Sequence, residues 1–177
     1  MVGLTHAGLG LLALSLAGPV SGAEAALCVA GSLLPDIDSP GSMAGRLVPG
    51  SSWGRTGRAA VGLGLCLAGL SERSAALAGA GLVLAAAGFL GHRGFTHSLA
   101  GLACAAALAW QLLGPAWWAF ALGWLVHLGA DAFTPWGVPV LWPSPKRFGV
   151  AVVRTGSLPD RLLGFLALGL GLTRGVR

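Results

Sequence analysis

Apolar residues occur along this chain in seven segments that are separated by glycines, prolines and short polar stretches. The segments lie near residues 4–18, 22–34, 59–71, 74–90, 98–113, 115–131 and 161–173. Each is rich in Leu, Ala, Val and Gly, and most would form a helix of roughly 20–25 Å at the α-helical rise per residue. The pattern predicts an all-α bundle of about six to seven short helices, with two long polar loops at residues 36–58 and 132–160.

The composition indicates that this bundle lies in a membrane. Of the 177 residues, 55% are hydrophobic and 10% are charged, whereas a soluble domain has about 25% charged residues. The predicted helices are shorter than the ~30 Å hydrocarbon core, so we expect them to extend into loops, thin the bilayer or penetrate it partly. The length predicts a single integral membrane domain over residues 1–177. No cleaved signal peptide is expected, because no Lys or Arg precedes the first apolar segment.

The chain is basic, with a formal net charge of +5, and its basic residues lie mainly in the loops between apolar segments. This placement is typical of membrane topology signals and of contact with anionic lipid headgroups. We therefore expect the lipid bilayer, and not nucleic acid, as the partner of these residues. The three cysteines lie singly within apolar segments, which predicts free thiols rather than disulfides or metal ligands.

Histidines and aspartates gather at the ends of the apolar segments. Together they supply seven side chains that suit a metal ion, namely His6, Asp36, Asp38, His92, His97, His127 and Asp131. Ionisable groups are costly near hydrocarbon and are functional candidates there. Imidazole and carboxylate without thiolate favour one or two Zn²⁺ ions, with Mn²⁺ or Fe²⁺ as alternatives. Each residue alone also fits a helix cap or a hydrogen-bonded pair, and only their joint placement favours a metal site.

The segment count places all seven residues on one membrane face if each segment crosses once. Eight basic residues fall on the same face, namely Arg46, Arg55, Arg58, Arg93, Lys146, Arg147, Arg154 and Arg161, while three fall opposite, namely Arg73, Arg174 and Arg177. Tryptophans occur near both faces, with Trp53, Trp136 and Trp142 on the first and Trp110, Trp117 and Trp118 on the second. By the positive-inside rule, the metal site of this multi-pass protein faces the cytoplasm.

Residue spacing suggests how such a site would work. His127 and Asp131 lie four residues apart, so on a helix they share one face and can hold one ion. Asp36 and Asp38 would point the same way in an extended segment, about 7 Å apart, where they could bridge two ions or supply one ligand and one base. Arg93 either stabilises charge on a phosphoryl group or anchors the membrane interface.

Three motifs follow one another in the chain. They are Leu-Leu-Pro-Asp-Ile-Asp-Ser-Pro at 33–40, Gly-His-Arg-Gly-Phe-Thr-His-Ser at 91–98 and His-Leu-Gly-Ala-Asp-Ala-Phe-Thr-Pro at 127–135. In this order they resemble the YdjM family of bacterial inner-membrane proteins, which are classed as metal-dependent hydrolases. The resemblance extends from His6 to about residue 148. It implies a helical inner-membrane enzyme whose ligands come from the seven His and Asp residues, and it marks residues 59–90 as an inserted hairpin.

The third motif is also similar to the metal motif of zinc-dependent phospholipase C and P1-type nucleases, which implies phosphodiester hydrolysis. Two positions depart from these patterns. Ser39 stands where the YdjM motif usually has His, and Trp136 and Gly137 follow Pro135 where the phospholipase-like motif carries another His. Either fewer ions bind, or other residues complete the ligand shell.

These features predict a membrane-embedded, metal-dependent hydrolase that cleaves a phosphate ester of a membrane lipid at the cytoplasmic surface. Asp36, Asp38 and Arg93 are the predicted catalytic residues, acting with a water molecule that the metal activates. A metal- or proton-coupled transporter is an alternative, although it would need ionisable residues near the middle of the membrane. A non-catalytic membrane scaffold is another alternative, and the sequence carries no signal for an oligomeric state.

Overall fold

The computed structural model describes residues 1–48, 52 and 54–175, and Trp53 and Arg177 lie outside this part of the chain. Its long elements are the helices α1 (Gly3–Ala17), α2 (Gly22–Leu33), α4 (Gly54–Ser71), α5 (Ala75–Leu90), α6 (Leu99–Leu113), α7 (Trp117–Ala132) and α8 (Leu158–Gly175). Its shorter elements are α3 (Met43–Leu47) and the 3₁₀ turns η1 (Leu34–Asp38), η3 (Phe95–His97) and η4 (Gly114–Ala116). The predicted all-α bundle is confirmed, since each long helix in the described residues corresponds to one apolar segment of the sequence.

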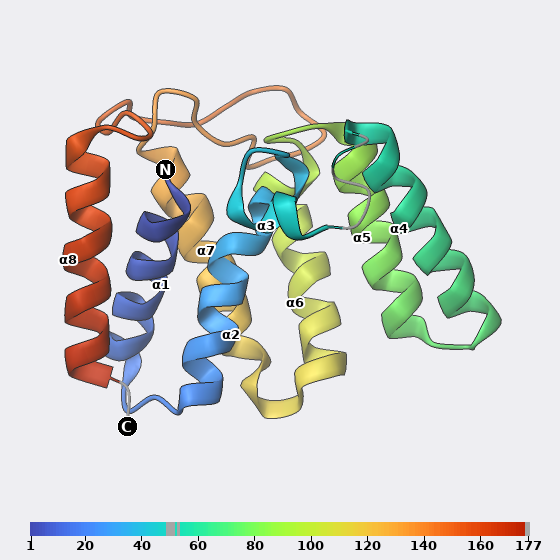
Figure 1. The fold of residues 1–177 in the computed structure, drawn as a ribbon, viewed down its shortest axis with the longest axis horizontal. Coiled ribbons are helices and arrows are strands. Elements are labelled where there is room, and N and C mark those ends of the chain that lie inside the picture. The colour runs from blue at the N-terminus through green and yellow to red at the C-terminus, as the bar shows by residue number, and fades with distance from the viewer. Residues whose placement is uncertain (49–51, 53, 176–177) are drawn as a thin grey trace.

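The long helices stand side by side, and successive ones along the chain alternate in direction, so their ends form two faces (Figure 1). One face carries the start of α1, the η1–α3 segment, the turn before α6 and the long loop between α7 and α8. We call this the site face. The opposite face has the short connections within the pairs α1–α2, α4–α5 and α6–α7. Every predicted ligand lies in a segment at or near the site face, so the expectation of a single face is confirmed.

Among the described residues, one helical run, Leu99–Ala132, is long and apolar enough to cross a membrane. This run is two helices, α6 and α7, and not one straight helix. The chain reverses between them at Gly114, whose positive φ of 54° is a conformation that glycine adopts readily. Taken singly, α6 and α7 have 15 and 16 residues. Both are shorter than the ~20 residues that span a hydrocarbon core, as the sequence predicts.

Serine caps fix the starts of several helices. The Ser21 hydroxyl accepts a hydrogen bond from the Glu24 amide, and the Glu24 carboxylate accepts one from the Ser21 amide, which forms a capping box at α2. Ser74 and Ser98 cap α5 and α6. Because Ser98 also ends the 91–98 motif, the segment that carries two candidate ligands leads directly into a fixed helix start.

Glycines let the helices that carry the site approach closely. A Cβ added at Gly123 of α7 would lie 2.0 Å from the carbonyl oxygen of Cys28 in α2, and Gly31 of α2 makes a similar contact with the α7 backbone. In the α4–α5 hairpin, Gly62 and Gly81 lie equally close to the opposite helix. Small residues are the usual means of close packing between membrane helices. The α2–α7 contact therefore sets the spacing of the bundle beneath the site.

Besides Arg93, two charged residues outside the predicted ligand set are buried. Asp160 in the first turn of α8 accepts hydrogen bonds from Thr5 Oγ1 (2.7 Å) and the Val2 amide (3.1 Å), and so fastens α8 to the start of α1. Arg58 is fully buried, and its guanidinium has no hydrogen-bond partner among the described residues. The prediction that Arg58 is a loop cation at the lipid headgroups is wrong, because α4 begins at Gly54 and takes Arg58 into the packed hairpin.

Gly123→Ala should lower the free energy of unfolding by about 1–3 kcal/mol, the usual cost of overpacking a close contact. Gly129→Ala in the same helix is the matched control, because nothing lies within 4 Å of a Cβ at that position. Thermal unfolding of the purified protein in detergent measures both variants. Equal melting temperatures for the two would contradict the close α2–α7 contact.

Candidate metal centre

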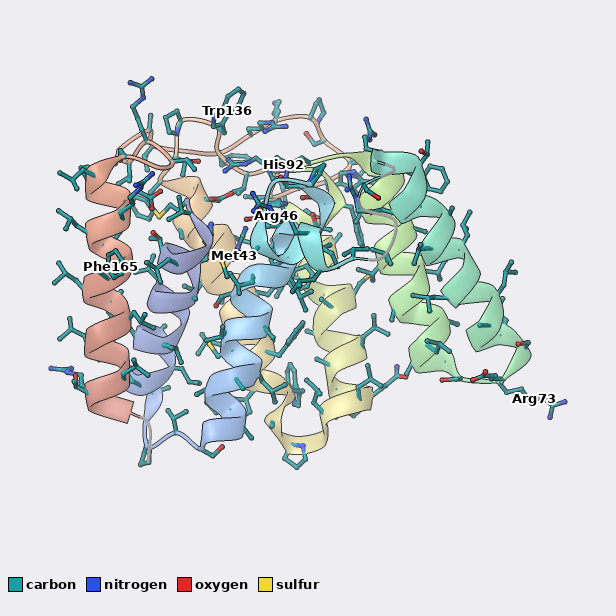
Figure 2. All side chains as sticks on the ribbon, in the orientation of Figure 1. Met43, Arg46, Arg73, His92, Trp136 and Phe165 are labelled. Carbon is teal, nitrogen blue, oxygen red and sulfur yellow. The ribbon has the colours of Figure 1, made fainter. Side chains whose placement is uncertain are left out.

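The seven predicted ligands come together near the site face from four chain segments. They are His6 from α1, Asp36 and Asp38 from η1, His92 and His97 from the segment between α5 and α6, and His127 and Asp131 from α7. Asp36 and His92 have side chains that are 18% and 43% exposed, whereas the other five are buried. His92 is labelled in Figure 2, where it lies at the site face above Arg46. The centre is therefore closed toward the bundle and open beside these two residues.

Three buried residues form the inner triad, His6, His127 and Asp131, whose ligand atoms all lie within 4.8 Å of one another. The imidazole rings of His6 and His127 stack with their centroids 3.8 Å apart. His6 Nε2 lies 3.3 Å from Asp131 Oδ1, but neither ring nitrogen of His6 has a partner with hydrogen-bond geometry. Because an unsatisfied buried imidazole is costly, the inner triad fits a bound cation that would satisfy His6.

Asp36, His92 and His97 form the outer triad, with ligand atoms inside the same 4.8 Å limit. The outer triad adjoins the inner one, since His97 Nε2 lies 3.2 Å from His127 Nε2. Asp36 Oδ1 lies 3.3 Å from the Nε2 atom of His97 and 3.7 Å from that of His127. One carboxylate therefore faces both triads, in the position that a ligand shared by two ions would take.

Hydrogen bonds on the far side of the rings orient three of the histidines. Their Nδ1 atoms face the Ser32 carbonyl oxygen at 2.7 Å (His127), Asp38 Oδ1 at 2.7 Å (His92) and Thr96 Oγ1 at 3.0 Å (His97). Metal-binding histidines usually donate such a hydrogen bond, which fixes the tautomer and aims the other nitrogen at the metal. If both rings were neutral with Nδ1 protonated, the Nε2 lone pairs of His97 and His127 would face each other at 3.2 Å, and either a metal ion or a second proton on His97 would relieve their repulsion.

Asp38 makes its contacts on the outer side of these rings. Its Oδ2 accepts hydrogen bonds from Thr96 Oγ1 (2.7 Å) and from the Arg93 amide (3.1 Å), while its Oδ1 faces His92. Asp38 belongs to neither of the two triads whose ligand atoms converge. Its role as a ligand or a base stays a prediction, and its contacts are those of a residue that holds the 91–98 segment in place.

Arg93 is buried, and its guanidinium points into the protein. One nitrogen lies 2.6 Å from Asp131 Oδ2, and the other donates to the Gly137 carbonyl (2.8 Å) and to Thr134 Oγ1 (3.1 Å). The residue has a left-handed φ of 57°, which is uncommon outside glycine and requires support from the surrounding contacts. Arg93 thus joins the 91–98 segment to the end of α7 and orients one of the inner ligands.

Three supporting residues were not predicted, namely Ser32, Thr96 and Thr134. Thr96 and Thr134 lie within the motifs at 91–98 and 127–135, and their place in these motifs is the sequence feature that could have identified them. Ser32 contributes its backbone carbonyl to His127, so its side-chain type carries no signal for this role. Trp124 was also missed, and its indole donates to the Thr96 carbonyl at 3.0 Å.

Charge pairing shifts the protonation of the groups on the loops of the site face. Burial opposes ionisation of Asp36 and Asp38, but the neighbouring histidines outweigh it and hold the pKa of each carboxyl below its usual value. Burial also opposes protonation of His97, yet Asp36 and Asp38 raise its pKa to about 9. Metal-free His97 is therefore an imidazolium near neutral pH, and it must lose a proton to bind a metal ion.

A polar cavity of about 310 Å³ opens beside the outer triad. Asp36, His92 and Arg93 line it on one side, and residues of the α3 segment line it on the other. A second cavity of about 330 Å³ shares His92 and Arg93 and is also lined by Arg147. The outer triad therefore borders two cavities, and the exposed Arg147 lines one of them.

A bundle of short apolar helices with buried His and Asp triads at one face defines a helical membrane protein with a candidate metal centre. The chain belongs to the YdjM inner membrane protein family, whose family model matches residues 1–174. It is therefore an inner membrane protein. The resemblance stated from the three motifs is confirmed over nearly the whole chain.

Two named relatives are similar over a shorter stretch. The chain is 44% identical over 72 residues to the inner membrane protein YdjM of Escherichia coli (strain K12), and it matches the protein of the same name from Shigella flexneri to the same extent. Each match covers 36% of this chain and 36% of the relative, so it spans about a third of the length of these curated proteins. No solved structure matches the chain.

The affinity for a metal ion should rise with pH and level off near pH 9, where His97 loses its proton. Below that pH, an ion that binds at the outer triad displaces one proton from His97, which gives a gain of about tenfold in affinity per pH unit. Zn²⁺ titration against a chelating dye at several pH values measures this slope. Asp38→Asn removes one carboxylate that raises the pKa of His97, so the affinity of this variant should level off at a lower pH than that of the wild-type protein. An affinity independent of pH in the wild-type protein would contradict the assignment.

Proposed function

We propose that this protein is a metal-dependent hydrolase that cleaves a phosphate ester of a membrane lipid at the site face. The contact between the two triads carries the proposal, because His97 Nε2 lies 3.2 Å from His127 Nε2 and Asp36 Oδ1 lies within 3.7 Å of both nitrogens. Such a cluster suits two neighbouring ions, an arrangement that many phosphatases and nucleases use on phosphate esters.

The donor atoms favour Zn²⁺, with Mn²⁺ and Fe²⁺ as alternatives, because both triads offer imidazole nitrogens and carboxylate oxygens. His6, His127 and Asp131 would hold one ion, and the outer triad would hold the other. When bound, the ions would polarise a phosphoryl oxygen and lower the pKa of a water molecule. Side chains of the protein would accept the proton, orient the ligands and bind the phosphate.

Asp36 is the residue best placed to take part in the reaction. Its carboxylate faces both triads and lines the polar cavity, whereas Asp38 is fully buried and hydrogen-bonded on both oxygens. We expect Asp36 to be a metal ligand and to accept a proton from the attacking water. Asp38 would act by holding His92 and the 91–98 segment in position.

The two arginines beside the cavity would have different roles. Arg93 is paired with Asp131 at 2.6 Å, so we assign it to the orientation of that ligand. Arg147 is exposed and lines the cavity that also contains His92. A guanidinium in this position suits a phosphate group, and we assign phosphate binding to Arg147.

The position of the site supports a lipid as the substrate. The site face is formed by the ends of apolar helices, so in a membrane it lies at the depth of the lipid headgroups. Arg46 and Arg147 lie on this face, where they attract anionic groups. A phosphate ester carried by a lipid therefore meets the centre without leaving the membrane.

Asp36→Asn should abolish turnover, with a loss of about 10²-fold or more, because it removes the proton acceptor. His127→Ala should lose bound metal and activity together. Asp38→Asn should cost about 10–100-fold while most of the metal stays bound, as expected of a residue that orients a ligand. Elemental analysis gives the metal content, and release of headgroup or phosphate from a panel of phospholipids and polyprenyl phosphates gives the activity.

Arg73→Ala is the control for these variants, because Arg73 lies at the end of the hairpin far from the site face (Figure 2). It should keep both the metal and the rate of the wild-type protein. Metal-loaded wild-type protein that is inert toward the entire panel would contradict the hydrolase proposal. Such a result would favour a transporter or a scaffold.

We also infer that the site face is cytoplasmic, because most loop arginines lie on it and Arg73 lies opposite. In a variant without native cysteines, Ser71→Cys on the opposite face should react with an impermeant maleimide on intact cells. Ser144→Cys on the site face should react only after the membrane is opened. Labelling of Ser144→Cys from outside would reverse this orientation.

A further inference from the structure

An apolar groove separates the α4–α5 hairpin from the rest of the bundle. Its inner part has a volume of about 320 Å³ and is lined by four helices, through residues that include Leu27 of α2, Val83 of α5, Leu108 of α6 and Trp124 of α7. Its outer part has a volume of about 740 Å³. Ala30, Leu34, Ile37 and Leu84 line both parts, so they form one continuous groove.

The outer part of the groove meets the polar cavity of the candidate metal centre. Leu33, Met43 and Ala44 line both the groove and the cavity that contains Asp36 and His92. Short helix α3 therefore forms a wall between an apolar space and the outer triad. This continuity distinguishes the groove from an ordinary lipid-facing furrow, which would end without reaching a polar site.

Helix α3 presents apolar side chains and a cation at this junction. Met43 is 61% exposed and Leu47 is 85% exposed, and these residues lie four apart on one side of the helix. Arg46 lines the same stretch of groove, and Figure 2 shows Met43 and Arg46 beside each other below His92. The junction is thus apolar toward the groove and positively charged toward the site face.

We propose that this groove holds one hydrocarbon chain of the lipid whose phosphate headgroup occupies the metal centre. This proposal rests on the proposed function. It specifies the substrate as a lipid phosphate whose phosphate binds at the metal centre and whose hydrocarbon chain binds in the groove. The phosphate is drawn to Arg46, Arg147 and the outer triad, while the chain passes α3 and runs between α5 and α6. Apolar walls with a few polar groups at one end are typical of a built ligand site.

A photo-crosslinking experiment tests the proposal with the wild-type protein in phosphatidylcholine nanodiscs. The probe is phosphatidic acid with a diazirine near the end of one acyl chain, and a phosphatidylcholine with the same diazirine is its counterpart. The phosphatidic acid probe should form adducts on Leu108 and Trp124 in the groove. Excess unlabelled phosphatidic acid should remove these adducts, and the phosphatidylcholine probe should not form them.

Adducts on the outer surface of α8, where Phe165 is 63% exposed, report bulk lipid and should be equal for the two probes. Ala80→Phe fills the groove from α5 and should remove most groove adducts while leaving those on α8. Ala107→Phe is the matched control, because this exposed alanine of α6 lines none of the cavities described above. It should leave both sets of adducts unchanged.

Equal labelling of the groove by both probes, without competition, would overturn the proposal and make the groove ordinary lipid-facing surface. This readout is independent of turnover. If the protein hydrolyses lipid phosphates but its groove is not labelled selectively, the result supports the proposed function and contradicts the binding of a lipid chain in the groove. If the groove is labelled selectively but the metal-loaded protein is inert toward all lipids, the result supports lipid binding in the groove and contradicts the proposed hydrolase activity.

Discussion

The site face depends on one constraint, which is that ionisable side chains buried at helix ends must be satisfied by one another or by a cation. Asp131 is at the centre of this network. Its Oδ1 lies 3.3 Å from His6 Nε2 and its Oδ2 lies 2.6 Å from Arg93, while the Nε2 atoms of His97 and His127 lie within 4.0 Å. These partners come from α1, α7 and the 91–98 segment. Removing one partner of a buried charge costs about 3–5 kcal/mol, so the network holds the three segments together.

The packing beneath the site follows from the same constraint. Gly123 lies one helical turn before His127 in α7, and its contact with the α2 backbone brings the two helices to their closest approach. That approach places the Ser32 carbonyl 2.7 Å from His127 Nδ1. A larger residue at Gly123 would move α2 away and leave the His127 ring without its orienting acceptor. A glycine that has no side chain to bind a metal therefore determines where a ligand nitrogen points.

The sequence was a good guide to the helices and to the face on which the site lies, and a poor guide to the contacts that the site residues make with one another. Runs of apolar residues and helix parity depend on local composition, which can be read directly. The separation of Asp36 from Asp38 depends on the turns of η1 and on partners more than 50 positions away, such as Thr96. Arg58 was misplaced for a related reason, since only the packed hairpin takes it out of the loop.

The two triads differ in access, and this difference would suit them to different roles. All three side chains of the inner triad are buried, so an ion held there would stay in place and fix the helix ends. The outer triad contains Asp36 and His92, the two exposed ligands, and both line the cavity. Under the proposed function, water and substrate would reach the centre from that side. Because the cavity meets the apolar groove at Met43 and Ala44, α3 lies where a lipid would have to divide, with its phosphate toward the triads and its chain toward the membrane.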